Sequence, residues 1–112
     1  MSIAVPVMVT RVIDGDTIVG DVTVMLHDMK FTLFDQHYRL NGINAPEITG
    51  IEKPLGLQSK GFLISLIEGK EIMVVSNDKD KYGRFLADLY MDDGLHINAH
   101  MVNQGFAEWR EY

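Results

Sequence analysis

The sequence predicts a mainly β domain whose strands close into a barrel, accompanied by one longer and one short helix. Short stretches rich in Val and Ile alternate with turn residues such as Asp14-Gly15 and Asp93-Gly94. The best helical stretch follows the third predicted strand. The 112 residues suffice for one hydrophobic core and leave little room for two. Because the five-stranded OB-fold is a common small closed barrel of this kind, we expect residues 1–112 to form a single OB-fold domain.

Three strands are expected in the first 40 residues. Val7–Ile13 is rich in β-branched residues and ends at an Asp-Gly turn. Thr17–Leu26 follows it, and Met29–Leu40 is the third strand, with its apolar residues on both faces. Asn41–Pro54 is rich in Asn, Gly and Pro and is expected to be a loop.

The longer helix is predicted at Gln58–Ile67, because helical spacing puts four apolar residues in one stripe, namely Phe62, Leu63, Leu66 and Ile67. Gly69 is expected to end this helix in a left-handed conformation. The remaining segments are, in order, a strand at 71–75, a polar loop at 76–83, a strand at 84–91 and a short helix at 98–104.

Composition excludes several classes of protein. The formal net charge of −6 argues against a passive nucleic-acid coat protein, although carboxylates that gather around a cation also contribute negative charge. The absence of cysteine excludes disulfides and thiolate metal sites. The apolar segment Met1–Thr10 is short, lacks a basic start and contains Pro6, so we expect neither a signal peptide nor a membrane span, and an intracellular location.

Four local motifs carry candidate chemistry. Each alone has a structural interpretation, as a turn, a surface arginine, a loop carboxylate or a solvated hairpin. The motifs are Val12-Ile13-Asp14-Gly15-Asp16-Thr17, Tyr38-Arg39-Leu40-Asn41-Gly42-Ile43-Asn44-Ala45-Pro46-Glu47, Asp80-Lys81-Tyr82-Gly83-Arg84, and Asn98–Trp109 with its internal Gly105-Phe106-Ala107.

In this combination and order the motifs resemble staphylococcal nuclease-like (thermonuclease) domains, over roughly Val9 to Trp109, and most closely the nucleases of phages and prophages. The resemblance implies an OB-fold hydrolase, a metal-dependent endonuclease that cleaves DNA or RNA phosphodiesters with little sequence specificity and leaves 3′-phosphate ends. Members of the family continue into a third, C-terminal helix. Because this sequence ends at Tyr112, we expect that helix to be absent.

The resemblance also implies roles for individual residues. Arg39 and Arg84 would clamp the scissile phosphate, and Glu47 would act as general base or orient the attacking water. One divalent cation, calcium in the best-known members with Mg²⁺ and Mn²⁺ left open, would be held by Asp16, Asn44 and the backbone carbonyl of Ala45. The residues expected to bind the terminal phosphate of the nucleotide, or to support the loop that does so, are Asp80, Lys81 and Tyr82.

The chemistry of phosphodiester hydrolysis accounts for this set of residues. Attack on the phosphate builds negative charge, which planar guanidinium groups neutralise in a bidentate geometry. A hard cation prefers oxygen ligands. Asn44 departs from the family, which usually has a second metal-binding aspartate here, so we expect weaker calcium binding or a changed metal preference.

Two other functions stay open at this stage. One is a non-catalytic nuclease-like module that binds single-stranded nucleic acid or a protein partner, and the other is a plain OB-fold single-strand binder. The presence of Arg39, Glu47 and Arg84 favours an enzyme. We expect a monomer that acts on nucleic acid, without a membrane or an obligate protein partner.

Overall fold

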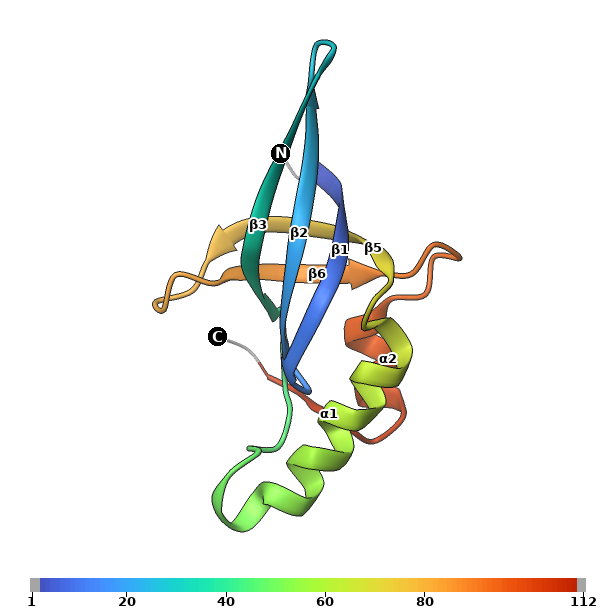
Figure 1. The fold of residues 1–112 in the computed structure, drawn as a ribbon. Coiled ribbons are helices and arrows are strands. Elements are labelled where there is room, and N and C mark those ends of the chain that lie inside the picture. The colour runs from blue at the N-terminus through green and yellow to red at the C-terminus, as the bar shows by residue number, and fades with distance from the viewer. Residues whose placement is uncertain (1–2, 111–112) are drawn as a thin grey trace.

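The computed structural model describes residues 3–110, and five of its strands close into a barrel (Figure 1). The first three strands are β1 (Ile3–Asp14), β2 (Thr17–Leu26) and β3 (Met29–Leu40). The barrel closes through β6 (Phe85–Tyr90) and β5 (Glu71–Lys79), which returns to β1. Only the β3–β6 pairing is parallel. This closed five-stranded barrel confirms the predicted OB-like fold class.

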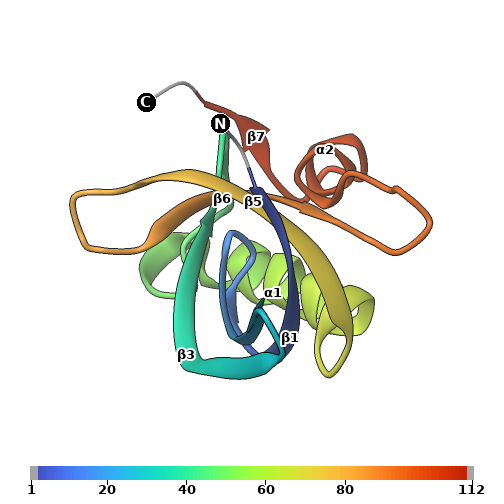
Figure 2. The ribbon, with the colours of Figure 1, turned by 90° about the horizontal axis from the view of Figure 1, so that it is seen from above.

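Two α-helices flank the barrel within the described residues. Helix α1 (Lys53–Ile67) runs beneath the barrel, and α2 (Ile97–Asn103) lies outside it (Figure 2). Neither helix is long and apolar enough to cross a membrane. The third helix that we expected to be absent would follow Arg110, where the chain lies outside the described residues.

The structure corrects the predicted start of the longer helix. Helix α1 begins at Lys53 rather than Gln58, because Pro54 occupies the first turn, where its missing N–H has no helical partner to lose. Gly69 follows the helix with a φ of 78°, as predicted. The fully buried face also differs from the predicted stripe and consists of Gly56, Ser59, Leu63 and Ile67.

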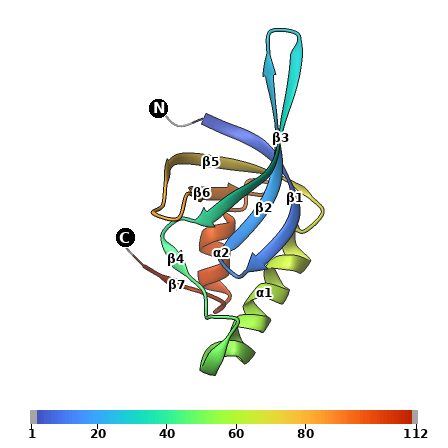
Figure 3. The ribbon, with the colours of Figure 1, turned by 60° about the vertical axis from the view of Figure 1, so that its left-hand side comes forward.

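Long-range pairing creates strands where the sequence predicted loops. The predicted 41–54 loop contains β4 (Ile43–Asn44), which pairs with β7 (Glu108–Trp109) (Figure 3), and the 3-10 helix η1 (Gly50–Glu52). Strand β5 extends to Lys79, because its last residues pair with the start of β6 even though their side chains are polar.

Candidate active site

The turn between β1 and β2 buries a carboxylate. Asp14 Oδ1 accepts a hydrogen bond of 3.0 Å from the Asp16 backbone N–H, which shapes the turn. The Thr17 hydroxyl donates to Asp16 Oδ1 at 3.0 Å, and Asp16 is only 6% exposed. A Cβ at Gly15 would lie 2.1 Å from Ser59 Oγ of α1, so only glycine allows the turn to sit this close to the helix.

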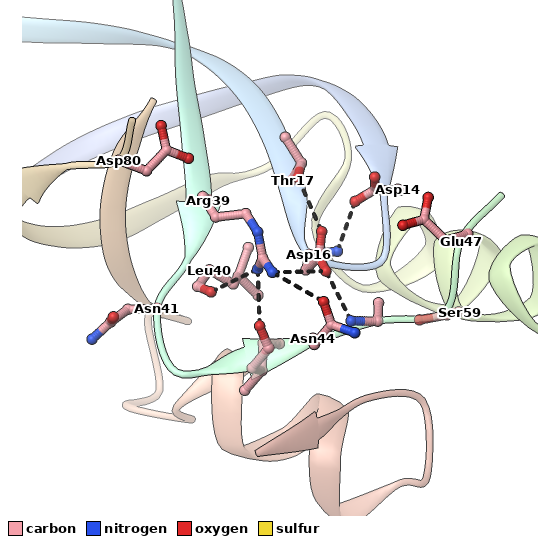
Figure 4. Close-up of polar contacts among 12 residues, drawn as sticks. Asp14, Asp16, Thr17, Arg39, Leu40, Asn41, Asn44, Glu47, Ser59 and Asp80 are labelled. Carbon is pink, nitrogen blue, oxygen red and sulfur yellow. Dashed lines mark hydrogen bonds and ion pairs between the residues drawn. The ribbon is translucent and has the colours of Figure 1, made fainter. Parts of the chain in front are cut away.

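Arg39 joins this turn to the chain that follows β3 (Figure 4). Its Nη1 donates to the carbonyl oxygens of Leu40 and Ile43, both at 3.0 Å. Its Nη2 lies 3.3 Å from Asp16 Oδ2 and 3.4 Å from Asn44 Oδ1. The guanidinium is therefore held in one orientation at the end of β3, with one edge toward two oxygens of the predicted metal site.

The Ala45 backbone N–H completes the cluster by donating to Asp16 Oδ2 at 2.8 Å. Burial raises the pKa of Asp16 from 3.8 to about 7, and the neighbouring Asp14 adds to the rise through a hydrogen bond and its charge. The Ala45 N–H and Arg39 oppose the shift without cancelling it. A negative charge on Asp16 is therefore costly until a further cation compensates it.

The donor atoms of this cluster are of the chemical type that a hard divalent cation prefers. A carboxylate of Asp16, the amide oxygen of Asn44 and the carbonyl of Ala45 are all oxygen ligands, and the burial of Asp16 leaves its charge undercompensated. The set carries one formal charge, and the described residues contain no group of three His, Cys, Asp or Glu side chains placed to hold a metal. These residues therefore fit a weakly held cation.

A second cluster forms in the turn between β5 and β6. Asp80 Oδ1 accepts hydrogen bonds from the backbone N–H groups of Tyr82 and Arg84, both at 2.9 Å, and its Oδ2 lies 2.7 Å from Arg84 Nε. Although desolvation acts in the opposite direction, these N–H groups and the guanidinium keep the pKa of Asp80 below its ordinary value. Asp80 thus stays ionised and fixes the Arg84 side chain through Nε, as the supporting role predicted for it requires.

The other two predicted substrate residues lie on the outside of this turn. The exposed Tyr82 ring lies under both neighbouring cations, with Lys81 Nζ 5.2 Å and Arg84 Cζ 5.2 Å from its centroid. These contacts bring one aromatic ring and two positive charges together in the turn between β5 and β6.

A pocket of about 360 Å³ brings the two clusters together. Its lining includes Arg39 from the first cluster and Asp80, Lys81, Tyr82 and Arg84 from the second, with Leu86 beneath. Figure 4 likewise shows Asp80 on the far side of Arg39 from Asp16. The side chains of Arg39 and Arg84, from distant parts of the chain, therefore line one hollow beside the buried carboxylate.

Glu47 is less fixed than the other predicted residues. It is exposed, and Figure 4 draws no hydrogen bond or ion pair from its carboxylate to Asp16, although the side chain is turned toward the Asp14–Asp16 turn. Its backbone N–H donates to Glu52 Oε1 at 3.2 Å. The structure thus fixes the backbone of Glu47 and leaves its carboxylate exposed to solvent.

Helix α1 supports the site from below, which the sequence analysis missed. A Cβ on Gly56 would lie 2.0 Å from the carbonyl oxygen of Glu47, and Ser59 lies directly beneath Gly15. Ser59 also donates to the Phe106 carbonyl at 2.7 Å. The only sequence signal for this role is the spacing of two small residues, Gly56 and Ser59, on the same helix face as Leu63.

Gly56→Ala is expected to displace the Glu47 loop, and Gly61→Ala supplies the matched control on the same helix. Position 61 has nothing within 4 Å of a new Cβ, whereas position 56 meets backbone. Both changes raise helix propensity by about 1 kcal/mol. We expect Gly61→Ala to raise the midpoint of thermal unfolding and Gly56→Ala to lower it. Equal midpoints, followed by calorimetry or circular dichroism, would contradict the close contact at Gly56.

Comparison with known proteins identifies the family to which the chain is similar. The profile of the staphylococcal nuclease homologues matches residues 37–112. This match covers Arg39, Asn44, Glu47 and Arg84 and leaves out β1, β2 and the turn between them, which carries Asp16.

Individual relatives extend the likeness to more of the chain. A protein named uncharacterized endonuclease from Escherichia coli O157:H7 is 37% identical over 99 residues, which are 88% of this chain and 57% of that protein. A probable staphylococcal-like nuclease of Oryza sativa subsp. japonica is 38% identical over 69 residues, which are 62% of this chain and 20% of that protein. The protein ParB of Escherichia coli is 32% identical over 107 residues, 88% of this chain and 54% of that protein.

The chain thus spans little more than half of its bacterial relatives. The family assignment does not depend on the rest of their length, because the profile matches well over half of this chain. The closed five-stranded barrel agrees with the fold that the resemblance implied. The chain belongs to the staphylococcal nuclease homologue family.

Proposed function

We propose that this domain is a nuclease that hydrolyses phosphodiester bonds of nucleic acids. The observation that carries the proposal is the pocket that Arg39 and Arg84 line together, beside the buried Asp16. Two arginine side chains on one hollow suit an anionic phosphate, because guanidinium groups are planar donors that match the geometry of phosphate oxygens. The names of the relatives, endonuclease and staphylococcal-like nuclease, support the same activity.

In the proposed mechanism the arginines bind the phosphate and stabilise the charge that attack builds on its oxygens. Arg39 is pre-oriented by two backbone carbonyls, and Arg84 by the Asp80 carboxylate, so little reorganisation is needed when the phosphate binds. Arg84 binds Asp80 through Nε, so its terminal nitrogens would contact the phosphate.

Glu47 is the proposed general base. Its exposed carboxylate, turned toward the site, can accept a proton from water while the water oxygen bonds to phosphorus. Breaking the bond from phosphorus to the 5′ oxygen then leaves a 3′-phosphate and, after protonation from solvent, a 5′-hydroxyl. Lys81 and Tyr82 would bind the neighbouring phosphate and base of a single or frayed strand, since both lie exposed at the rim of the pocket.

Asp16, Asn44 and the carbonyl of Ala45 would hold one divalent cation, which we propose to be Ca²⁺, with Mg²⁺ or Mn²⁺ as substitutes. When bound, such a cation polarises a phosphoryl oxygen and lowers the pKa of a bound water. The residues themselves contribute the carboxylate of Asp16, whose pKa is raised mainly by burial and further by Asp14.

Asn44→Asp is expected to tighten Ca²⁺ binding by about ten-fold or more, because the new carboxylate adds a second charge beside Asp16. Isothermal titration calorimetry with CaCl₂ measures the affinity. Asn41→Asp is the matched control, since Asn41 is exposed and Figure 4 shows its side chain pointing away from Asp16. Equal affinities for wild type and Asn44→Asp would remove Asn44 from the proposed metal site.

The function itself is tested with single-stranded and plasmid DNA, and with RNA, in Ca²⁺, Mg²⁺, Mn²⁺ or a chelator. We expect cleavage that requires a divalent cation and leaves ends that a 3′-phosphatase makes extendable. Glu47→Gln should lower the rate by about 10²–10⁴ without loss of folding. DNA and RNA that bind but stay intact under every condition would instead identify a non-catalytic binding module.

A further inference from the structure

Strands β2 and β3 extend beyond the barrel as a two-stranded arm, residues 23–34, which projects from one end of the molecule (Figures 1 and 3). In the antiparallel register, directly opposite residues point to the same side, and sides alternate along the strand. Every second pair from the base of the arm to its tip is apolar on both strands. These pairs are Val22–Leu33, Val24–Phe31 and Leu26–Met29.

The apolar face formed by these pairs is largely uncovered. Leu26, Met29, Phe31 and Leu33 are 55%, 51%, 44% and 50% exposed. The opposite face is mixed: Thr23 lies opposite Thr32 and Met25 opposite Lys30, and Met25 and Phe34 are 59% and 67% exposed, so only the first face is apolar at every paired position. The arm is therefore amphipathic, like a sheet with one face meant for a partner.

At its base this apolar face continues into the open end of the barrel. Val24 lines a pocket of about 620 Å³ there, together with the apolar or aromatic Val5, Tyr38 and Phe85 and the polar Ser76, Asp78 and Lys79. The arm also has unpaired edges in the described part of the chain. Residues 23–26 of β2 pair only with β3, and β3 pairs with β6 only at 38–40. A two-stranded ribbon is marginally stable by itself, so a packed partner would stabilise it.

We infer that the arm is the interface of a reversible dimer, in which the apolar faces of two copies of this chain pack against each other. A twofold contact needs a self-complementary surface, and an apolar face meets that condition. The charge distribution favours the same region. Two chains of net charge −6 repel each other, but Asp28 and Lys30 are the only charged residues in 23–34 and they cancel.

The area of the face sets the strength of this contact. At roughly 200 Å² for a fully exposed large side chain, the four half-exposed residues contribute about 400 Å² per copy. With the neighbouring barrel mouth, two arms would bury on the order of 1,000–1,200 Å², which is the lower limit for specific interfaces. We therefore expect a dissociation constant of roughly 1–100 μM rather than a permanent dimer.

This arrangement leaves the candidate active site open. Phe31 lies eight residues before Arg39 on the same strand, or about 26 Å at 3.3 Å per residue. The dimer is thus independent of the proposed nuclease activity. It differs from the monomer that we expected from sequence, because the exposure of the arm became visible only in the folded chain.

Sedimentation equilibrium over a wide range of protein concentration tests the inference. Wild type should change from monomer to dimer, whereas Phe31→Lys and, as a second variant, Leu33→Lys should stay monomeric at concentrations at least ten-fold above the wild-type midpoint. Thr32→Lys adds the same charge to the opposite face of the arm and should dimerise like wild type. Circular dichroism confirms that each variant is folded.

Three results would overturn the inference. The first is a wild-type protein that stays monomeric up to about 1 mM, where only some 4 kcal/mol of binding would be needed. The second is a dimer that persists in both Phe31→Lys and Leu33→Lys. The third is a dimer that Thr32→Lys disrupts as strongly as they do, since the interface would then lie elsewhere on the arm or involve its edges.

Discussion

Arg84→Ala is expected to lower kcat for nucleic-acid hydrolysis by about 10²–10³, the usual effect of removing one donor that stabilises developing charge. Arg84 is the better of the two arginines to test. Arg39 also binds the backbone carbonyls of Leu40 and Ile43, so its removal would disturb the local fold. Arg84 is half-buried and bonded through its side chain to Asp80. Steady-state cleavage of a fluorescent oligonucleotide measures kcat and KM separately.

Two further variants make this result specific. Arg84→Lys keeps the charge but loses the planar fork, and should recover only part of the rate. Arg11→Ala removes an exposed arginine on β1 that does not line the phosphate pocket, and should cleave like wild type. If Arg84→Ala retained full kcat, the shared pocket of the two arginines would not be the catalytic site.

Asp16→Asn is expected to stabilise the fold at pH 8 while abolishing cleavage. In the folded chain the pKa of Asp16 is about 7, mainly because of burial, against 3.8 for an unperturbed aspartate. Between these values the folded state binds more protons than the unfolded state, so stability falls as pH rises through this window and levels off above about 7. Asparagine removes the buried charge. The expected gain at pH 8, without divalent cation, is on the order of 1–4 kcal/mol.

Urea unfolding at several pH values measures this difference. The gap between Asp16→Asn and wild type should close as pH falls below about 4, because Asp16 then becomes protonated in the unfolded state as well as in the folded state. Asp28→Asn, at the exposed tip of the arm, should follow wild type throughout. Added Ca²⁺ should stabilise wild type and not Asp16→Asn. An Asp16→Asn variant that is less stable than wild type at pH 8 would show that the ion pair with Arg39 outweighs the cost of burial.

Much of the fold could be read from local patterns. The alternation of Val and Ile with turn residues placed the first three strands, and Gly69 marked the end of α1. These features depend on neighbours within a few residues, where side-chain periodicity and turn chemistry act. The loop predictions were wrong where a segment pairs with a strand that is distant in the sequence. Strand β4 exists because Ile43 and Asn44 meet Trp109 and Glu108, some 65 residues away.

The candidate site was also predictable only in part. Its residue types and their order were visible in the motifs around Asp16, Arg39 and Arg84, and these sufficed to recognise the family. The contacts that orient them were not visible, because they cross between elements. Ala45 donates to Asp16 across 29 positions, and Gly56 contacts Glu47 from a part of α1 that precedes the helix predicted at Gln58–Ile67.

The sequence by itself determined the order of the first three strands and the longer helix along the chain, the family, and the chemical types of the candidate site residues, because these follow from local pattern and motif. The tertiary structure decided how those groups are held. It decided that Asp16 is buried with a raised pKa, and that Arg39 and Arg84 share one pocket. It also decided that the apolar face of the arm stays uncovered, since burial depends on what packs against a residue and a sequence does not specify that partner.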